Sequence, residues 1–153
     1  MALNIIFMGT PEFAVPILDT INNSKHKVLG VYTQPPSKKN RGQKFKISPV
    51  HEYSEKAKLN IRYPEKLDTV VEYEYLKNLK PHVVIVVAYG KIIPLKILNL
   101  KNIEFINIHA SLLPKWRGAA PIQRSIMNCD KVSGISIMKI VSELDAGPTL
   151  IQA

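Results

Sequence analysis

An asparagine and a histidine that are separated by one residue have side chains suited to group-transfer chemistry. Asn107 and His109 end an apolar run, 104–109, that is typical of a strand, so their side chains face the same side. An amide N–H can stabilise a developing oxyanion, and an imidazole moves protons near neutral pH. A polar strand edge carrying an ordinary histidine is the alternative interpretation.

A carboxylate farther along the chain adds a third group. Asp145 lies in a turn-like segment, 143–147, shortly after a run at 134–140 that predicts another strand. Placed beside His109, its carboxylate would raise the basicity of the imidazole and help to relay a proton. A carboxylate that only stabilises the turn is the alternative.

The other histidines are weaker candidates for a catalytic or metal-binding role. The remaining histidines have polar surroundings or open a strand, and we expect them to be structural or solvent-facing: His26, His51 and His82. No histidine, cysteine and carboxylate cluster has the spacing of metal ligands, so we expect no metal.

The loop that follows His109 is long and distinctive. Residues 109–121 contain two leucines and two prolines, which favour a stiff apolar wall, and Arg117 is suited to hold an anion. Leu112, Leu113 and Trp116 completing an apolar core is the alternative.

The elements that must position these residues alternate along the chain. Runs rich in β-branched residues predict strands at 3–8, 28–33, 83–88, 104–109 and 134–140. N-cap residues, prolines suited to a first helical turn and the spacing of apolar residues predict helices at 10–21, 48–58, 70–79, 94–98 and 121–127. Pro16 fits the first of these only if that helix begins late. The fold class is therefore α/β: a mainly parallel, Rossmann-like sheet with helices on both faces.

Ligands of such sheets bind beyond the carboxyl ends of the strands. Three segments fall at expected strand ends, which makes them site candidates: 9–10, 88–90 and 107–109. The first turn has a single glycine rather than a dinucleotide-binding fingerprint, and no Walker-type sequence is present.

Composition limits the class of protein. The chain has 153 residues, enough for one domain, and is 46% hydrophobic and 22% charged, as in ordinary globular proteins. Its one cysteine, Cys129, excludes an internal disulfide. The longest apolar run is too short to span a bilayer, and residues 1–8 have neither a charged region nor a small-residue cleavage site, so we expect no secretory signal. We expect a cytoplasmic protein with no membrane association.

The positive charge is concentrated in one segment. Net charge is +9, and residues 34–48 hold five cations and no acid. Such a segment attracts polyanions such as phosphate backbones, although a solvated charged loop is the alternative. Its prolines and Gly42 predict a segment without packed structure.

Five segments of the sequence closely resemble those of the methionyl-tRNA formyltransferases, and the resemblance extends over essentially the whole chain. They are IFMGTPEFA at 6–14, VVAYGKIIP at 86–94, NIHASLLPKWRGAAPIQR at 107–124, GISIM at 134–138 and LDAG at 144–147. The segment from His109 to Pro114 is shared by formyltransferases that use 10-formyltetrahydrofolate. The first string, the end of the third and the basic segment favour the tRNA-dependent members.

The resemblance implies a role for each group of residues. Asn107, His109 and Asp145 would be catalytic. The formyl donor, 10-formyltetrahydrofolate, would bind Ser111, Leu112, Leu113 and Pro114 and, on its pterin side, Ala88, Tyr89 and Gly90. Lys38, Lys39, Arg41 and Lys44 would contact the acceptor end of methionyl-initiator tRNA. We expect a monomer.

The resemblance also bears on domain organisation. Residues 1–153 would be the N-terminal formyltransferase catalytic domain, incomplete at its C-terminal end. The family's C-terminal β-barrel domain, which helps to hold tRNA, would be absent. Alternative functions are formylation of another amine (a sugar nucleotide or glycinamide ribonucleotide), hydrolysis of formylfolate, and tRNA binding without catalysis.

Overall fold

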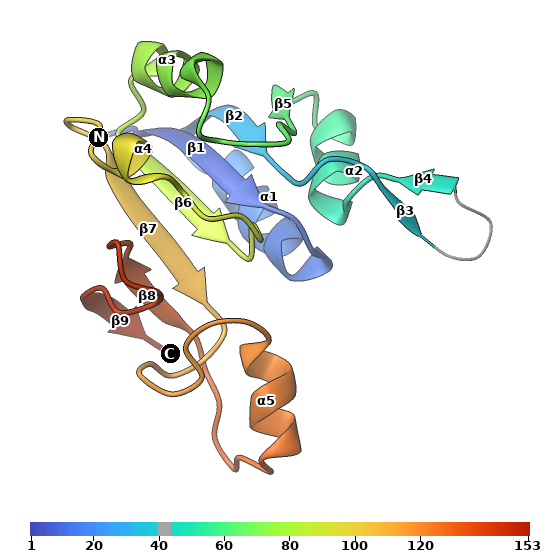
Figure 1. Cartoon of the computed structure of the whole chain (residues 1–153), viewed down its shortest axis with the longest axis vertical. Coiled ribbons are helices and arrows are strands. Elements are labelled where there is room, and N and C mark those ends of the chain that lie inside the picture. Colours follow the sequence, from blue (N-terminus) through green and yellow to red (C-terminus); the bar gives the residue numbers. More distant parts are fainter. Residues whose placement is uncertain (40–43) are drawn as a thin grey trace.

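The computed structural model describes residues 1–39 and 44–153. Within them, seven strands form one sheet in the order β5-β2-β1-β6-β7-β8-β9 (Figure 1). These strands are β1 (Asn4–Gly9), β2 (Lys27–Tyr32), β5 (Ile61–Arg62), β6 (Val83–Val87), β7 (Glu104–His109), β8 (Ser136–Lys139) and β9 (Thr149–Gln152).

The sheet is parallel from β5 to β7 and antiparallel beyond it. The pairs β2–β5, β1–β2, β1–β6 and β6–β7 are parallel, whereas β7–β8 and β8–β9 are antiparallel. The predicted mainly parallel α/β fold is confirmed. The sequence did not reveal β5 or β9, because two- and four-residue strands carry little periodicity.

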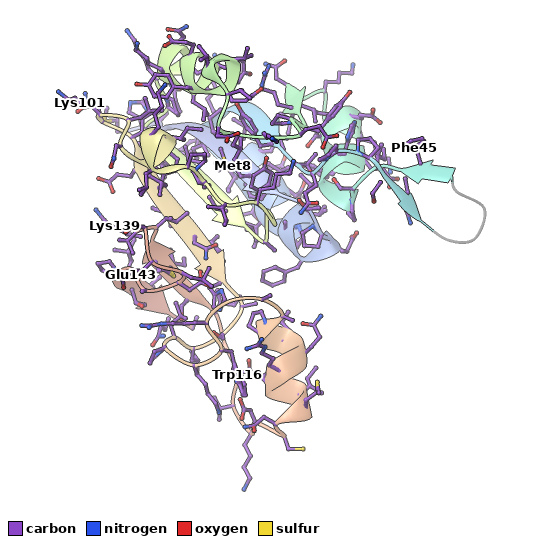
Figure 2. The ribbon with its side chains drawn as sticks, viewed as in Figure 1. Met8, Phe45, Lys101, Trp116, Lys139 and Glu143 are labelled. Atoms are coloured by element: carbon purple, nitrogen blue, oxygen red, sulfur yellow. The ribbon has the colours of Figure 1, made fainter. Side chains whose placement is uncertain are left out.

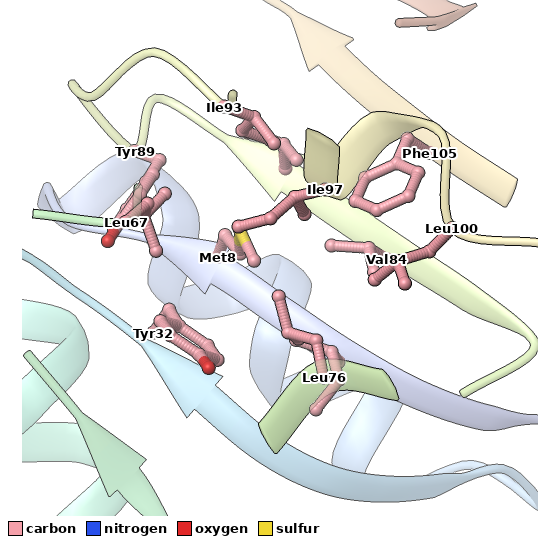
Figure 3. Packing of buried hydrophobic residues seen from close by; sticks show 12 residues of the cluster. Met8, Tyr32, Leu67, Leu76, Val84, Tyr89, Ile93, Ile97, Leu100 and Phe105 are labelled. Atoms are coloured by element: carbon pink, nitrogen blue, oxygen red, sulfur yellow. The ribbon is translucent and has the colours of Figure 1, made fainter. Parts of the chain in front are cut away.

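Helices cover both faces of the parallel part. On one face, α3 (Val70–Leu79) and α4 (Leu95–Leu98) place Leu76 and Ile97 against Met8 and Val84 (Figure 3). On the other, the core includes Leu18 from α1 (Val15–Asn22) and Val50 from α2 (Pro49–Lys56). Residues that alternate along β1 therefore enter two different cores, which is why the strand is apolar throughout.

Local sequence signals explain where the helices begin. The Ser48 and Thr69 side chains cap α2 and α3 by accepting hydrogen bonds from the third residue after each. The first predicted helix divides into a 3₁₀ turn, η1 (Glu12–Ala14), and α1. Pro16 then lies in the first turn of α1, where its missing N–H has no helical partner to lose.

The basic segment, for which the sequence predicted no packed structure, forms a two-stranded hairpin in its described part. Strands β3 (Ser37–Lys39) and β4 (Lys44–Lys46) pair antiparallel. This pairing needs only local backbone hydrogen bonds, and the two prolines precede β3 instead of interrupting it. The hairpin projects away from the main sheet (Figure 1).

An ion pair joins α3 to the β5 edge of the sheet. Arg62 Nε donates to Glu72 Oε2 over 2.9 Å, and the Tyr32 hydroxyl donates to the same oxygen over 2.8 Å. Burial opposes ionisation of Glu72, but the bonds from Arg62 and Tyr32 outweigh it, and its pKa lies below the ordinary value. Among the described residues, no helix is long and apolar enough to cross a membrane.

Candidate active site

Strand β7 carries the first two candidate residues. It lies between β6 and β8, and Asn107 and His109 pair with Met138 and Ser136 of β8. Because β8 is antiparallel, it ends beside the start of β7. The segment between β8 and β9 returns along the sheet and brings Asp145 to Asn107 and His109.

The side chains of these three residues, called the trio below, converge as the sequence predicts. Asn107 Nδ2 donates to Asp145 Oδ1 over 3.2 Å. His109 Nδ1 lies 3.7 Å from Asp145 Oδ2, and these two side chains are only 7% and 13% exposed. The Gly118 backbone N–H donates to the same oxygen over 2.8 Å. The carboxylate is therefore held in place by two donors and faces the imidazole.

The second ring nitrogen of His109 has a different neighbour. Nε2 lies 2.9 Å from the backbone carbonyl oxygen of Trp116. A carbonyl oxygen only accepts hydrogen bonds, so Nε2 carries the proton and donates it. In the neutral ring, the lone pair is then on Nδ1, the nitrogen beside Asp145. The sequence did not reveal this contact, since it uses a backbone atom.

Unusual backbone conformations gather around the trio. Trp116, Ala120 and Asp145 have φ values of 61°, 57° and 45°, and Gly118 has 86°. Only glycine adopts this region without strain, and such conformations persist where the surrounding structure imposes them. At Gly118 the conformation accompanies the N–H bond to Asp145.

The segment 111–114 is held by β8 and β9. Ser136 Oγ donates to the Ser111 carbonyl over 2.7 Å and accepts from the Leu113 N–H over 2.9 Å. Gln152 Nε2 donates to the Leu113 carbonyl over 2.9 Å. The Ser111 hydroxyl donates to the Lys115 carbonyl, so it acts within the loop.

The side chains of this segment differ in exposure. Leu112 and Leu113 are half-buried, and Pro114, which follows a cis peptide bond, is exposed. The sequence did not single out Ser136 or Gln152 for this role, because their importance comes from contacts across the sheet.

The segment 88–90 follows β6, the neighbour of β7. The Tyr89 carbonyl accepts from Thr10 Oγ1 over 2.8 Å and from Gln34 Nε2 over 3.2 Å. Ala88 and Gly90 are exposed, whereas the Tyr89 side chain is buried in the α3–α4 core (Figure 3). At the end of β6, therefore, Tyr89 presents its backbone, while its side chain belongs to the core. Gln34 was not predicted from the sequence.

The structure does not bring the basic hairpin to the trio. Arg41 lies outside the described residues, and so do the side chains of Lys38, Lys39 and Lys44. Figure 2 shows Phe45 on the hairpin at one side of the molecule, while Trp116 lies near α5 (Pro121–Met127) in another part.

Two hollows in the described part of the molecule differ in size and position. The larger, about 580 Å³, lies at the amino end of β6 and β7, away from the trio, and its lining includes Lys77, Lys80 and Lys101. The smaller, about 330 Å³, is lined by Trp116, Arg124, Met127 and Asn128. The described part of the chain contains no group of three histidine, cysteine or acidic residues placed to hold a metal ion.

Curated relatives match nearly the whole chain. A methionyl-tRNA formyltransferase of Pelagibacter ubique is 58% identical over 149 residues, which are 97% of this chain and 48% of the relative. One from Coxiella burnetii is 48% identical over 153 residues, covering 100% of this chain and 49% of its own length. The chain thus spans about half the length of these relatives.

Solved structures share the fold at low identity. A phosphoribosylglycinamide formyltransferase from Anaplasma phagocytophilum has a TM-score of 0.76 at 19% identity, over 99% of this chain and 71% of its own. A formyltetrahydrofolate deformylase from Pseudomonas syringae has a TM-score of 0.75 at 20% identity, over 100% and 51%. The sequence model of the formyl transferase family matches residues 3–153, and this chain therefore belongs to that family.

Proposed function

We propose that this chain transfers the formyl group of 10-formyltetrahydrofolate to the α-amine of methionyl-initiator tRNA. Residues 1–153 would form its catalytic domain. The observation that carries the proposal is the convergence of Asn107, His109 and Asp145 in one partly buried constellation. Similarity to relatives named methionyl-tRNA formyltransferase supports the choice of acceptor.

The chemistry needs no covalent enzyme intermediate. The unprotonated amine attacks the formyl carbon, forming a C–N bond and a tetrahedral oxyanion. Collapse breaks the bond between that carbon and N10 of the folate, and N10 takes up a proton. The net change is one proton moved from the amine to N10, so the site must stabilise the oxyanion and transfer that proton.

The trio supplies both requirements. One N–H of the Asn107 amide is bonded to Asp145, and its second N–H is suited to donate to the oxyanion. His109 accepts the amine proton at Nδ1, and Asp145 beside it stabilises the resulting imidazolium. Proton delivery to N10 then returns the imidazole to its starting state.

The folate would lie along the carboxyl edge of β6 and β7. These strands are adjacent and parallel, so the segments that follow them, 88–90 and 111–114, leave the sheet at the same edge. Together they offer backbone polar groups and the half-buried side chains of Leu112 and Leu113 to the donor. The donor's formyl carbon would then lie beside the trio.

The basic hairpin would contact the acceptor end of the tRNA. Its cations, Lys38, Lys39, Arg41 and Lys44, attract phosphates, and a small amine acceptor needs no such segment. The hairpin lies apart from the trio, which suits an acceptor large enough to contact both regions.

Formyl transfer with defined acceptors tests the proposal. The purified chain is incubated with 10-formyltetrahydrofolate and methionyl-initiator tRNA, and formylmethionyl-tRNA is measured. Parallel reactions contain glycinamide ribonucleotide, an amino-sugar nucleotide, or no acceptor. We expect product only with the tRNA, and none from His109→Ala. Equal or faster transfer to a small amine, or hydrolysis alone, would contradict the proposal.

A further inference from the structure

A second carboxylate, outside the trio, is surrounded by hydrogen-bond donors. Asp130 follows α5, and its Oδ1 accepts from Lys115 Nζ and from Asn128 Nδ2, each over 2.7 Å. Its Oδ2 accepts from the indole Nε1 of Trp116, also over 2.7 Å. The side chain is 6% exposed. The three donors, Lys115 foremost, lower the pKa of Asp130 to about 2, so the group is ionised at neutral pH.

Trp116 connects this carboxylate to His109. Its indole is bonded to Asp130, while its backbone carbonyl accepts from His109 Nε2 over 2.9 Å. Trp116 also has a φ of 61°, which a non-glycine residue adopts only when its surroundings impose it. Asp130 accepts from the side chains of both Lys115 and Trp116, so it is linked directly to the turn that carries this carbonyl.

We propose that Asp130 is a positioning residue for His109. By holding the turn at 115–116, it aims the Trp116 carbonyl at Nε2, keeps the ring proton on that nitrogen, and leaves the Nδ1 lone pair facing Asp145. With the carbonyl displaced, the imidazole is free to protonate either nitrogen, and only the Nε2–H form places a proton acceptor beside Asp145.

The state of the His109 ring distinguishes this role from general support of the loop. Segment 111–114 has its own anchors in Ser136 and Gln152, which do not involve Asp130. Losing Asp130 should therefore alter the tautomer of His109 while the loop stays attached to the sheet. A supporting role alone would leave the tautomer unchanged.

Two variants remove the link from opposite sides. Asp130→Asn keeps the size of the side chain but turns an amide N–H₂ toward one of the donors. Trp116→Phe keeps an aromatic ring but removes the indole donor and reduces the size of the side chain. Asp68→Asn is the matched control, with the same change of group at an exposed site that has no hydrogen bond or ion pair in the described structure.

Nitrogen NMR of the histidine rings gives a readout that needs no activity. In alkaline solution, where imidazoles are neutral, we expect His109 to show a single Nε2–H tautomer in the unchanged chain and in Asp68→Asn. In both test variants its two nitrogen signals should move toward the averaged position of mixed tautomers. The signals of His26, His51 and His82 should stay in place, which verifies the fold.

The kinetic consequence rests on the proposed function. Each test variant should lower kcat for formyl transfer about tenfold, with KM for the folate donor changed by less than about twofold. The double variant should be no slower than the slower single variant, because both changes break one link.

The outcomes separate the two proposals. An unchanged His109 tautomer in Trp116→Phe, the milder variant, would overturn the positioning role, and so would mixed tautomers in the unchanged chain. Absence of formyl transfer by the unchanged chain would instead overturn the proposed function and leave the tautomer result standing.

Discussion

At the scale of single residues, His109 should be the most sensitive position for turnover. His109→Ala removes the group proposed to move the proton, and general acid–base catalysis contributes about 10²–10⁴-fold to rate. We expect kcat for formyl transfer to fall by at least about 10²-fold, measured under saturating donor and acceptor. Folate binding should persist, since segment 111–114 is anchored by Ser136 and Gln152.

The control for this change is another histidine. His82 accepts a hydrogen bond from the Asn4 N–H and is exposed at the amino end of β6, away from the trio. His82→Ala should retain turnover close to that of the unchanged chain. A comparable loss in both variants would indicate a general effect on the fold and would count against a catalytic His109.

Asn107 should affect a different part of the reaction. Asn107→Ala removes the proposed oxyanion donor and one of the two hydrogen bonds that hold Asp145. We expect kcat to fall by about 10²–10³-fold, as for other lost oxyanion donors. Steady-state kinetics should show little change in KM. A loss confined to KM would instead assign Asn107 to substrate binding.

At the scale of elements, the ion pair between α3 and β5 should contribute to stability and to its pH dependence. Glu72→Gln breaks the pair with Arg62, and we expect a loss of about 2–3 kcal/mol in the free energy of unfolding at neutral pH. The loss should lie below that of a fully buried pair because the Arg62 side chain is 28% exposed. Urea unfolding measures it.

The sign of the pH effect follows from the pKa of Glu72. Its folded-state pKa lies below the ordinary value of 4.5, so its contribution is fully present above that value and is lost as pH falls through the folded-state pKa. Stability of the unchanged chain should decline more steeply in acid than that of Glu72→Gln. Glu74→Gln, on the same helix with a 46% exposed side chain, is the control and should change neither property.

The basic hairpin should govern the salt dependence of RNA binding. Alanine at Lys38, Lys39, Arg41 and Lys44 should weaken tRNA binding and reduce the slope of log affinity against log salt by about 3, because fewer counterions are released. Binding is measured over a series of salt concentrations.

A second set of four alanines controls for net charge. Lys77, Lys80 and Lys101 line the larger hollow, and Lys96 lies over the Tyr73 ring near it. Replacing these lysines removes the same charge at the amino end of the sheet, and we expect a much smaller change in slope. Equal effects of the two sets would show that affinity follows total charge rather than the hairpin.

At the scale of the whole molecule, the number of contacts that residues 1–153 can make with tRNA should limit their activity. The chain spans about half the length of its curated relatives, and contacts remote from the reacting atoms help to position a substrate. We expect the 153-residue chain to formylate methionyl-tRNA about a hundredfold more slowly than a fusion carrying the remaining half of the Pelagibacter ubique relative.

The comparison is made by kcat and KM for tRNA on both proteins. Placing His109→Ala in the longer protein should abolish the restored activity, which would show that the trio in this chain performs the reaction. Equal turnover of the two proteins would contradict the proposed role of remote contacts.

Sequence alone determined the features that depend on local composition. Apolar β-branched runs predicted the strands that became β1, β2, β6 and β7, because a strand buried on both faces must be apolar throughout. Ser48 marked the start of α2 because its side chain caps the helix it precedes. The spacing of Asn107 and His109 placed them on one side of a strand.

Tertiary structure decided the features that depend on partners far along the chain. Pairing across the sheet makes β8 antiparallel to β7. The segment that follows β8 can then bring Asp145 back to Asn107 and His109. The Trp116 carbonyl and the Gly118 N–H are backbone groups of a kind that every residue except proline carries in full, so no side-chain pattern reveals them. Asp130 gained its position only because folding brought three donors to one carboxylate.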